Sequence, residues 1–467
     1  MFYISFTKTD VAAQDRPVTF FYNGGPGSSS VYLLLGSFGP RRIKTKMPKF
    51  TPPPYSMEDN DDSLLDRTDL VFINPVGTGY SAAIAPKKNK DFWGVDQDAQ
   101  SIRQFIKRYL TRYGRWNSPK FLFGESYGTP RTCVLTWLLH EDGVDLNGII
   151  LQSSILDFSQ RFNSVGLLPT FAADALFYDK VTVSPLPTDV DSFMEQVQNF
   201  ARVQYAAAKA TYPTVDPATV RLLSQMIGIP IEVLENWNLD PTVGGNTIFL
   251  TSLLQNRVLG QYDGRANSDD TGIAGSVSSN SGGNDPTMTA VGGVYTAMWN
   301  VYLNEELMYI STSPFMAINF QANENWKYKH VDPTGTERGG QESLYTAGDL
   351  AASMEINPSL RVFCANGYYD AVTPFFQTKL DLENMPIGDK ANLDRLEFHN
   401  YESGHMIYLD NLKDSRSKMK KELAAFYDTT LAHPAALAAK LASRTEDRTE
   451  DQISTSRYRR RFNRTPY

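Results

Sequence analysis

The chain has 467 residues, 45 of them basic and 52 acidic, and its formal net charge of -7 argues against nucleic acid as a partner. Hydrophobic residues make up 41% and charged residues 21%, which is typical of a globular protein with a large core. No run of about 18 apolar residues is present, so no transmembrane segment is expected.

The N-terminus has the pattern of a strand, because Phe2, Ile4 and Phe6 alternate with other residues. It lacks the basic and apolar regions of a signal peptide. The protein is therefore expected to be cytoplasmic, or else periplasmic or secreted if an upstream leader has been lost from this sequence.

No metal or other cofactor is expected. The five histidines lack the spacing of metal ligands, and the two cysteines, Cys133 and Cys364, form no ligand pair. A single distant pair of cysteines is not a disulfide framework either, so both are interpreted as buried free thiols.

The first 154 residues alternate short apolar strands with helices. Strands are expected at 16–22, 69–74, 119–124 and 146–152, and helices at 95–113 and 132–140. Alternation of this kind predicts an α/β fold with a mostly parallel, doubly wound sheet. Residues 1–154 are accordingly interpreted as the first part of a core domain.

Residues 155–345 are richer in helical patterns and are interpreted as a mainly helical cap inserted into the sheet. Asp216 and Pro217 begin one helix, with a capping residue and a proline at its first position, and Pro230 begins another. The polar, glycine-rich stretch at 264–286 is expected to be a flexible loop.

Strand patterns return in the second part of the core, at 346–431. Strands are expected at 360–367 and 393–400, with helices from about Pro374 and over 411–427. The remaining residues, 432–467, are alanine-rich and then highly charged, and we expect them to form a disordered tail.

The stretch FGESYGTP follows the third expected strand and places Gly124 and Gly128 on either side of Ser126. A serine with this spacing is typical of a nucleophile on a strained turn between strand and helix, as in the α/β-hydrolases. The alternative is a tight loop that needs small residues.

The other parts of such a site occur in the required order. Asp370 follows the strand ending near residue 365, and His405 follows the strand ending near residue 400. Asp370 could instead cap the next helix, and His399 is the main rival of His405, although it lies within the strand. In this interpretation His405 takes the proton of Ser126 during attack, and Asp370 orients the imidazole.

An oxyanion hole requires preorganised backbone donors. The expected donors are the N–H of Tyr127, directly after the nucleophile, and the N–H of Gly25 in the sequence NGGPGSSS. A phosphate-binding loop is the alternative for this glycine-rich stretch, but the lysine that ends such a loop is missing.

The sequences FFYNGGPGSSS, INPVGTGYS, GESYGTP, NGYYDAVTPF and SGHMIY, in this order, resemble the signatures of the serine carboxypeptidase family, and most of all its bacterial branch. The resemblance extends to about residue 430. It implies an α/β-hydrolase fold with a helical insertion, removal of C-terminal residues from peptides, and activity at acidic pH. It also implies that Asn23 and Glu125 bind the terminal carboxylate of the substrate, for which Glu125 must be protonated.

The chain departs from the family pattern at several positions. Phe21 replaces a tryptophan, Ser28 a frequent cysteine, Ser37 a glutamate that supports the carboxylate site, and Ile407-Tyr408 a Val-Pro pair. The change at Ser37 puts the selectivity for C-terminal residues in question.

The sequence thus predicts a serine carboxypeptidase that acts on peptide substrates through an acyl-enzyme on Ser126. An esterase or acyltransferase with the same triad is the main alternative, and a non-enzymatic binding protein on a hydrolase scaffold is the third. The preferred C-terminal residue and the oligomeric state, monomer or homodimer, are left open.

Overall fold

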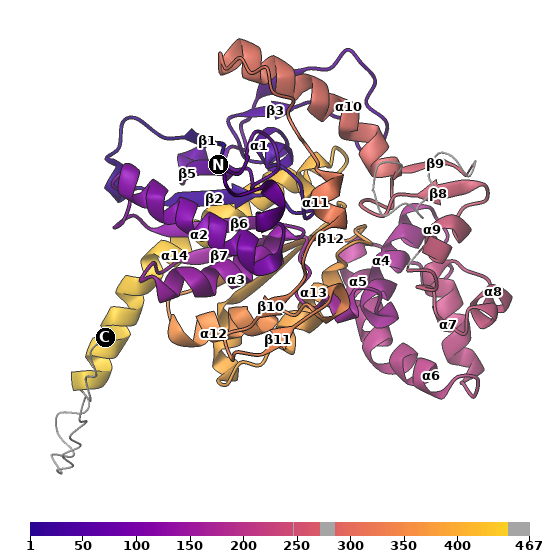
Figure 1. The fold of residues 1–467 in the computed structure, drawn as a ribbon. Helices are drawn as coiled ribbons and strands as arrows, with labels where there is room; N and C mark the ends of the chain where they lie inside the picture. The colour runs from indigo at the N-terminus through magenta and orange to yellow at the C-terminus, as the bar shows by residue number, and fades with distance from the viewer. Residues whose placement is uncertain (246, 271–284, 447–467) are drawn as a thin grey trace.

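A computed structural model describes residues 1–245, 247–270 and 285–446 of the chain (Figure 1). Its centre is a seven-stranded sheet in which only the edge strand β1 runs antiparallel to its neighbour. In spatial order the strands are β1 (Tyr3–Phe6), β5 (Asp69–Ile73), β2 (Val18–Tyr22), β6 (Lys120–Glu125), β7 (Gly148–Gln152), β12 (Arg361–Gly367) and β13 (Leu396–Tyr401). The prediction of a mostly parallel, doubly wound sheet is confirmed.

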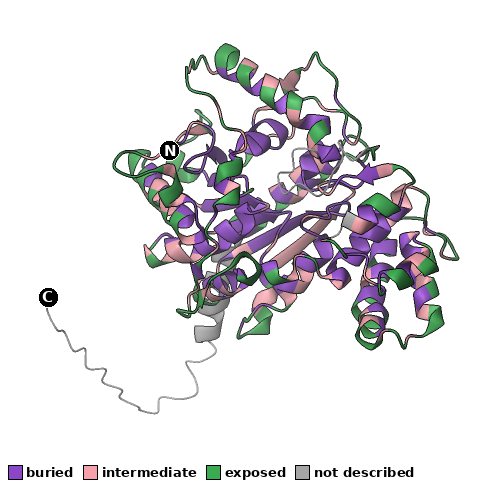
Figure 2. Ribbon diagram, turned by 45° about the vertical axis from the view of Figure 1, so that its right-hand side comes forward, coloured by how far each residue is buried: buried purple, intermediate pink, exposed green. Residues whose placement is uncertain are grey.

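Helices cover both faces of this sheet, because the strands bury side chains in both directions. In β2, Phe20 contributes to the core beneath α2 (Val95–Arg112), α3 (Gly128–Glu141) and α12 (Ala347–Ile356). The next residue, Phe21, contributes to the opposite core, beneath α1 (Val31–Gly36), α10 (Pro286–Val301) and α14 (Ser415–Glu446). Successive residues of a strand point to opposite faces, so the near-continuous apolar strands reflect two buried faces. Figure 2 shows the central strands buried and the exposed residues on the outer faces of the helices.

The register of the parallel strands brings their carboxyl ends to one edge of the sheet. Tyr22 pairs with Gly124, and Glu125 pairs with Gln152. On the other side of β7, β12 continues to Gly367, which pairs with Tyr401 of β13. The loops that follow these strands therefore share one edge, as in other open α/β sheets.

In the chain between β7 and β12, the elements over residues 164–259 form a second group that shares an apolar core. Figure 1 shows most of these helices grouped beside the sheet. Besides α10 and α12, which cover the sheet, the elements of this part of the chain are α4 (Ser164–Phe177), α5 (Val190–Phe200), α6 (Ala206–Thr211), α7 (Pro217–Ile227), α8 (Ile231–Asn236), α9 (Thr247–Ser252) and α11 (Phe320–Glu324), with the short strands β8 (Arg257–Leu259), β9 (Asn267–Asp269), β10 (His330–Val331) and β11 (Glu337–Arg338). The expected start of α7 is confirmed, with Asp216 as its cap and Pro217 as its first residue. The division of the chain into core and cap stays a prediction.

The remaining elements complete the core. The hairpin of β3 (Arg41–Ile43) and β4 (Met57–Asp59) packs near α1, and α13 (Phe375–Glu383) packs on α4. Among the described helices, none combines the length and the apolar character that crossing a membrane requires.

Two predicted segments differ from the structure. The flexible loop predicted at 264–286 is wrong at both ends: residues 267–269 form β9, Arg265 is buried, and Asp285 caps α10. At the two ends of this stretch, Arg265 packs through ion pairs and Asp285 through hydrogen bonds from backbone N–H groups, which composition does not reveal. Residues 271–284 lie outside the described residues.

The disordered tail predicted from residue 432 is wrong for its first part, because α14 continues as a helix to Glu446. Alanine has the highest helix propensity, which favours this continuation through Pro434. Residues 447–467 lie outside the described residues.

Candidate active site

Ser126 lies at the turn between β6 and α3, with a left-handed backbone φ of 59°. Both flanking glycines are needed by close packing. A Cβ atom at Gly124 would lie 2.2 Å from the carbonyl oxygen of Gly128, and one at Gly128 would lie 2.9 Å from that of Tyr22. The strained conformation and partial exposure of Ser126 are those of a nucleophile held out from the sheet edge.

Backbone hydrogen bonds hold this turn in place. The N–H of Ser126 donates to the carbonyl of Gln152 at 3.0 Å, and the N–H of Thr129 donates to the carbonyl of Ser126 at 2.8 Å. The turn is therefore attached both to the neighbouring strand β7 and to the first turn of α3.

Asp370 and His405 are brought together at the same edge. Asp370 Oδ2 lies 2.8 Å from His405 Nδ1, and Asp370 is fully buried. The other contacts of the carboxylate are the N–H groups of Val372 and Thr373 and the hydroxyl of Thr373. Asp370 thus contacts His405 and bonds the turn before α13. It does not cap that helix, whose N-cap residue is Pro374, without a side-chain cap.

The backbone of His405 is bonded on two sides. Its carbonyl accepts a hydrogen bond from the Ser153 hydroxyl at 2.6 Å, and its N–H donates to the carbonyl of Tyr262 at 2.6 Å. Burial lowers the pKa of His405, but the charge and hydrogen bond of Asp370 raise it, and the net shift is upward. Ser153, which bonds His405, directly follows Gln152, whose carbonyl accepts the Ser126 N–H. The loop that carries His405 therefore lies beside the turn that carries Ser126.

Among the described residues, the Ser126 hydroxyl and His405 Nε2 form no direct hydrogen bond. Bonds of this kind are often long before substrate binds and shorten in the complex.

The glycine-rich loop after β2 packs directly on the serine turn. A Cβ atom at Gly24 would lie 2.4 Å from the backbone nitrogen of Tyr127 and 2.9 Å from Ser126 Cβ. Gly25 has a φ of 104°, which a residue with a side chain rarely adopts. Within the described chain, the backbone N–H groups of Gly25 and Tyr127 have no acceptor, so both are free to bind a developing oxyanion.

Glu125 is buried beside this turn, and both of its carboxylate oxygens accept hydrogen bonds. Asn23 Nδ2 donates to Oε1 at 2.8 Å, and Gln152 Nε2 donates to Oε2 at 2.9 Å. Burial raises the pKa of Glu125 to about 7, against the opposing effects of His405, Tyr408 and Asn23. A carboxyl group of this kind is protonated below neutral pH and can then donate a hydrogen bond to another carboxylate.

Tyr408 was not predicted to belong to this group. Its hydroxyl is buried near Glu125 and lowers the pKa of that carboxyl group. The hydroxyl of Ser37 donates to the carbonyl of Leu33 at 2.6 Å. The sequence feature that could have indicated Tyr408 is its position three residues after His405.

Arg131 was also missed. It is buried in α3, where its guanidinium bonds Asp98 at 2.5 Å and the carbonyl of Asn23 at 2.7 Å. It also lies over the rings of Tyr22 and Tyr127. The sequence feature that could have indicated Arg131 is its charge, because the other residues at the start of this helix are apolar or small.

The other histidines lie elsewhere. His399 stacks on Phe363, with ring centroids 4.3 Å apart, and pairs with Glu397 and Glu422.

Both cysteines are buried free thiols, as predicted. In the described residues, no group of three or more His, Cys, Asp or Glu side chains could hold a metal ion.

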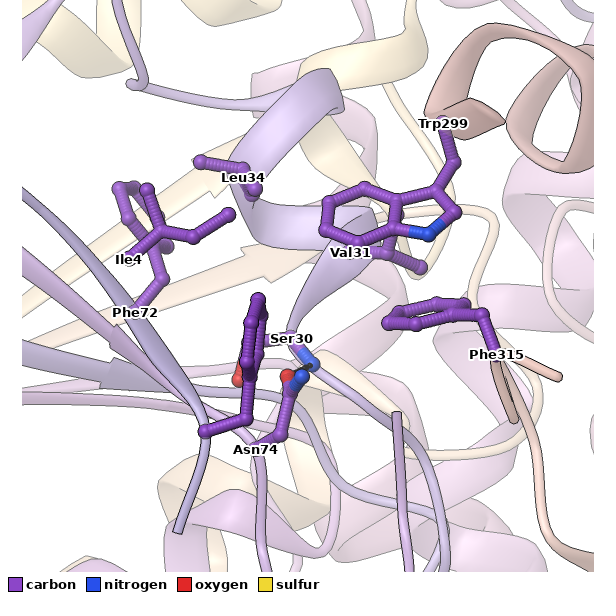
Figure 3. Close-up of a pocket in the computed structure, with 9 residues that line it drawn as sticks. Ile4, Ser30, Val31, Leu34, Phe72, Asn74, Trp299 and Phe315 are labelled. Atoms are coloured by element: carbon purple, nitrogen blue, oxygen red, sulfur yellow. Dashed lines mark hydrogen bonds between the residues drawn. The ribbon is translucent and has the colours of Figure 1, made fainter. Parts of the chain in front are cut away.

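A small, mainly apolar hollow lies apart from this site. Figure 3 shows Trp299 and Phe315 on one side of it, facing Leu34, Ile4 and Phe72. None of its lining residues belongs to the group around Ser126.

Comparison with known proteins finds similarity to one family of peptidases. Residues 1–212 match the family model of the serine carboxypeptidases. Serine carboxypeptidase-like 9 of Arabidopsis thaliana is 26% identical over 34% of this chain and 38% of its own length, and serine carboxypeptidase-like 2 of the same plant is 30% identical over 34% and 37%. The chain thus spans about a third of the length of these curated relatives.

The fold also matches a solved structure over nearly the whole chain. The crystal structure of Kex1(delta)p, a prohormone-processing carboxypeptidase from Saccharomyces cerevisiae, aligns with 91% of this chain and 86% of its own, with a TM-score of 0.54 and 17% identity. These relatives come from a plant and a yeast, so the expected bacterial branch stays a prediction. On the fold and these matches together, the chain has the α/β-hydrolase fold, and its residues 1–212 are similar to the serine carboxypeptidase family.

Proposed function

We propose that this protein is a serine carboxypeptidase that removes the C-terminal residue of peptides through an acyl-enzyme on Ser126. Ser126 is the nucleophile, His405 the general base and then the general acid, and Asp370 the residue that orients the imidazole. The contact of Asp370 with His405 at 2.8 Å and the strained turn at Ser126 support these roles.

The reaction proceeds in two halves. Ser126 Oγ attacks the carbonyl carbon of the last peptide bond as its proton passes to His405 Nε2. The carbon–nitrogen bond then breaks, and His405 returns the proton to the departing amine of the C-terminal residue. Water, deprotonated by His405, hydrolyses the ester and restores Ser126.

The free N–H groups of Gly25 and Tyr127 stabilise the oxyanion in both halves. Preorganised donors of this kind each contribute about 3 kcal/mol to lowering the barrier in serine hydrolases. The close packing of Gly24 on the serine turn supports this role, because it brings the loop that carries Gly25 against the Tyr127 nitrogen.

The observation that carries the proposal of an exopeptidase is the buried Glu125 next to Ser126. A substrate carboxylate beside it needs hydrogen-bond donors, which Asn23 and a protonated Glu125 can supply. Because burial raises the pKa of Glu125 to about 7, the donor form predominates in acidic solution and is lost as the pH rises through neutrality. We therefore expect carboxylate recognition to be favoured at acidic pH.

A time course with a library of N-blocked dipeptides and longer peptides at pH 5 and pH 7, read by mass spectrometry, tests the proposal. Stepwise loss of residues from the carboxyl end, faster at pH 5, is the expected result. Internal cleavage would contradict it, and turnover of esters alone would identify an esterase or acyltransferase that uses the same residues.

A fluorophosphonate probe tests whether the protein is an enzyme at all. Ser126 should be labelled in the natural protein, and the labelling should be lost in Ser126→Ala and His405→Ala. Absence of labelling in the natural protein would favour a non-enzymatic binding protein.

A further inference from the structure

Residues 261–265, between β8 and β9, form a segment of the insertion that we call the clamp segment (Figure 1). It packs against both loops that carry Asp370 and His405. Because it belongs to the part of the chain between β7 and β12, its contacts join the insertion to the two loops whose mutual position the reaction requires.

The clamp segment bonds the backbone on both sides of Asp370. The N–H of Gly264 donates to the carbonyl of Tyr369 at 2.9 Å, and the N–H of Ala371 donates to the carbonyl of Gln261 at 2.9 Å. The aspartate is thus held between two hydrogen bonds to one short stretch of chain.

The same segment contacts His405 itself. The carbonyl of Tyr262 accepts the N–H of His405 at 2.6 Å, and the Tyr262 ring meets the imidazole edge-to-face, with centroids 5.1 Å apart. Packing here is tight, since a Cβ atom at Gly404 would lie 2.4 Å from both the Tyr262 oxygen and Asp263 Cβ.

Arg265 joins these contacts through one buried guanidinium group, whose side chain is 1% exposed. It forms a two-fold contact with the carboxylate of Asp263 at 2.8 and 2.9 Å. In the loop that carries His405, it donates to Asp410 Oδ1 and to the carbonyl of Glu402, both at 2.8 Å. In the loop that carries Asp370, it lies over the ring of Tyr369, 4.8 Å from the ring centroid.

From these contacts we infer that the clamp segment is a positioning element for the Asp370–His405 pair, with Arg265 as its central residue. The planar guanidinium reaches acceptors in several directions at once, whereas a lysine ammonium is a single point of charge on a flexible stem. Arg265→Lys therefore keeps the charge against Asp263 and Asp410 but loses the geometry that joins the two loops.

The test has one arm that needs no substrate, because the inference rests on the proposed function. In proton NMR, the Nδ1 proton that His405 shares with Asp370 gives a low-field resonance, assigned by its loss in His405→Gln. We expect it to shift or broaden in Arg265→Lys and to stay unchanged in Arg202→Lys. Arg202 is the matched control: it bonds Glu383 of α13 at 2.8 Å and lies over the Phe376 ring, so it also joins the insertion to the core.

The kinetic arm uses a blocked dipeptide and counts competent sites by fluorophosphonate titration. In Arg265→Lys, kcat per titrated site should fall about tenfold or more with KM within about twofold, because a small displacement of a catalytic group lowers the rate of the chemical step. The inference would be overturned if the low-field resonance and the kcat per titrated site of Arg265→Lys were the same as those of the natural protein. A protein without peptide turnover whose resonance changes only in Arg265→Lys would instead contradict the proposed function.

Gly404→Ala is the second variant, for the case that Arg265→Lys does not fold. The added methyl group pushes the Tyr262 carbonyl away from the histidine loop and changes no charge. The same loss of kcat and the same change of the resonance are expected. A folded Gly404→Ala protein with the natural resonance would overturn the inference.

Discussion

Asp370 Oδ2 and His405 Nδ1 lie 2.8 Å apart although 35 residues separate them in the chain. The reason is the pairing of β12 with β13, which run parallel and end at the same edge of the sheet. The Thr373 hydroxyl adds a third member, donating to Asp370 Oδ2 at 2.6 Å and lying 3.1 Å from His405 Nδ1. The carboxylate is therefore saturated with donors and has a single orientation.

The first prediction concerns Asp370→Asn. An amide in this place favours the wrong tautomer of His405, so kcat on a blocked dipeptide should fall by roughly 10⁴-fold with little change in the circular dichroism spectrum. Asp394→Asn is the control, because Asp394 is an exposed aspartate in the chain between the same two strands. A loss of less than about tenfold in kcat would argue against the assigned role of Asp370.

The second prediction concerns Glu125→Gln. Because burial raises the pKa of Glu125 to about 7, KM for a blocked dipeptide should rise as the pH increases from 5 to 8 in the natural protein. The amide of the variant donates at every pH, so its KM should be independent of pH over this range. The measurement is KM at each pH for both proteins.

An ester substrate without a free carboxylate is the control for this variant. Its turnover should stay within a few-fold of that of the natural protein, because no carboxylate has to be bound. Equal loss of ester and peptide turnover would place Glu125 in the support of Ser126 rather than in carboxylate binding.

The third prediction concerns Gly24→Ala. The added Cβ would lie 2.4 Å from the Tyr127 nitrogen and 2.7 Å from the Glu125 carbonyl oxygen, so the glycine-rich loop must move away from the serine turn. Displacement of an oxyanion donor should lower kcat by about 10²-fold, measured per titrated site. The control is Gly292→Ala in α10, where an added Cβ would meet no atom within 4 Å outside its own helix backbone, so kcat should not change. Similar effects of the two variants would contradict the close packing of the loop.

The fourth prediction concerns stability. His330 is buried between Asp96 at 2.6 Å and Asp349 at 3.1 Å, and joins β10 to α2 and α12. Burial lowers its pKa, but the hydrogen bonds and charges of Asp349 and Asp96 raise it to about 9. A histidine with a raised pKa stabilises the fold fully below its unfolded pKa of about 6.5 and progressively less as the pH rises through 9.

The free energy of unfolding in urea should therefore fall between pH 6 and pH 9.5 by up to about 3 kcal/mol more in the natural protein than in His330→Gln. His140→Gln is the control, because His140 and its partner Asp145 are both substantially exposed. An equal pH dependence in the natural protein and His330→Gln would show that the imidazole is not charged in the folded state.

The sequence was sufficient to predict those features whose physical cause lies between neighbouring residues. The glycines around Ser126 are required because the strained turn brings Gly124 and Gly128 within contact of each other, and this requirement is visible in the spacing alone. The apolar strands were equally visible, since a strand buried on both faces must be apolar throughout. Asp370 and His405 were chosen as candidates because each follows a late strand, and strand ends in an α/β sheet meet at one edge.

Other features could not be found in this way. The polar stretch from Gly264 looked too polar to pack, yet Arg265 is buried because Asp263 and Asp410 neutralise it. Arg131 and Tyr408 reach the site through contacts with residues far away in the sequence. Such partners cannot be identified from composition, because a buried charge is tolerated only where the fold supplies its counter-charge.

The sequence by itself determined the turn at Ser126, the strands and the chain order of the proposed reactive residues, since steric limits and side-chain periodicity act between near neighbours. Only the tertiary structure decided that Glu125 is buried between two amides, with its pKa raised to about 7, and that the clamp segment touches both loops. Dehydration and ion pairing depend on residues from distant parts of the chain, and those meet only when the fold is complete.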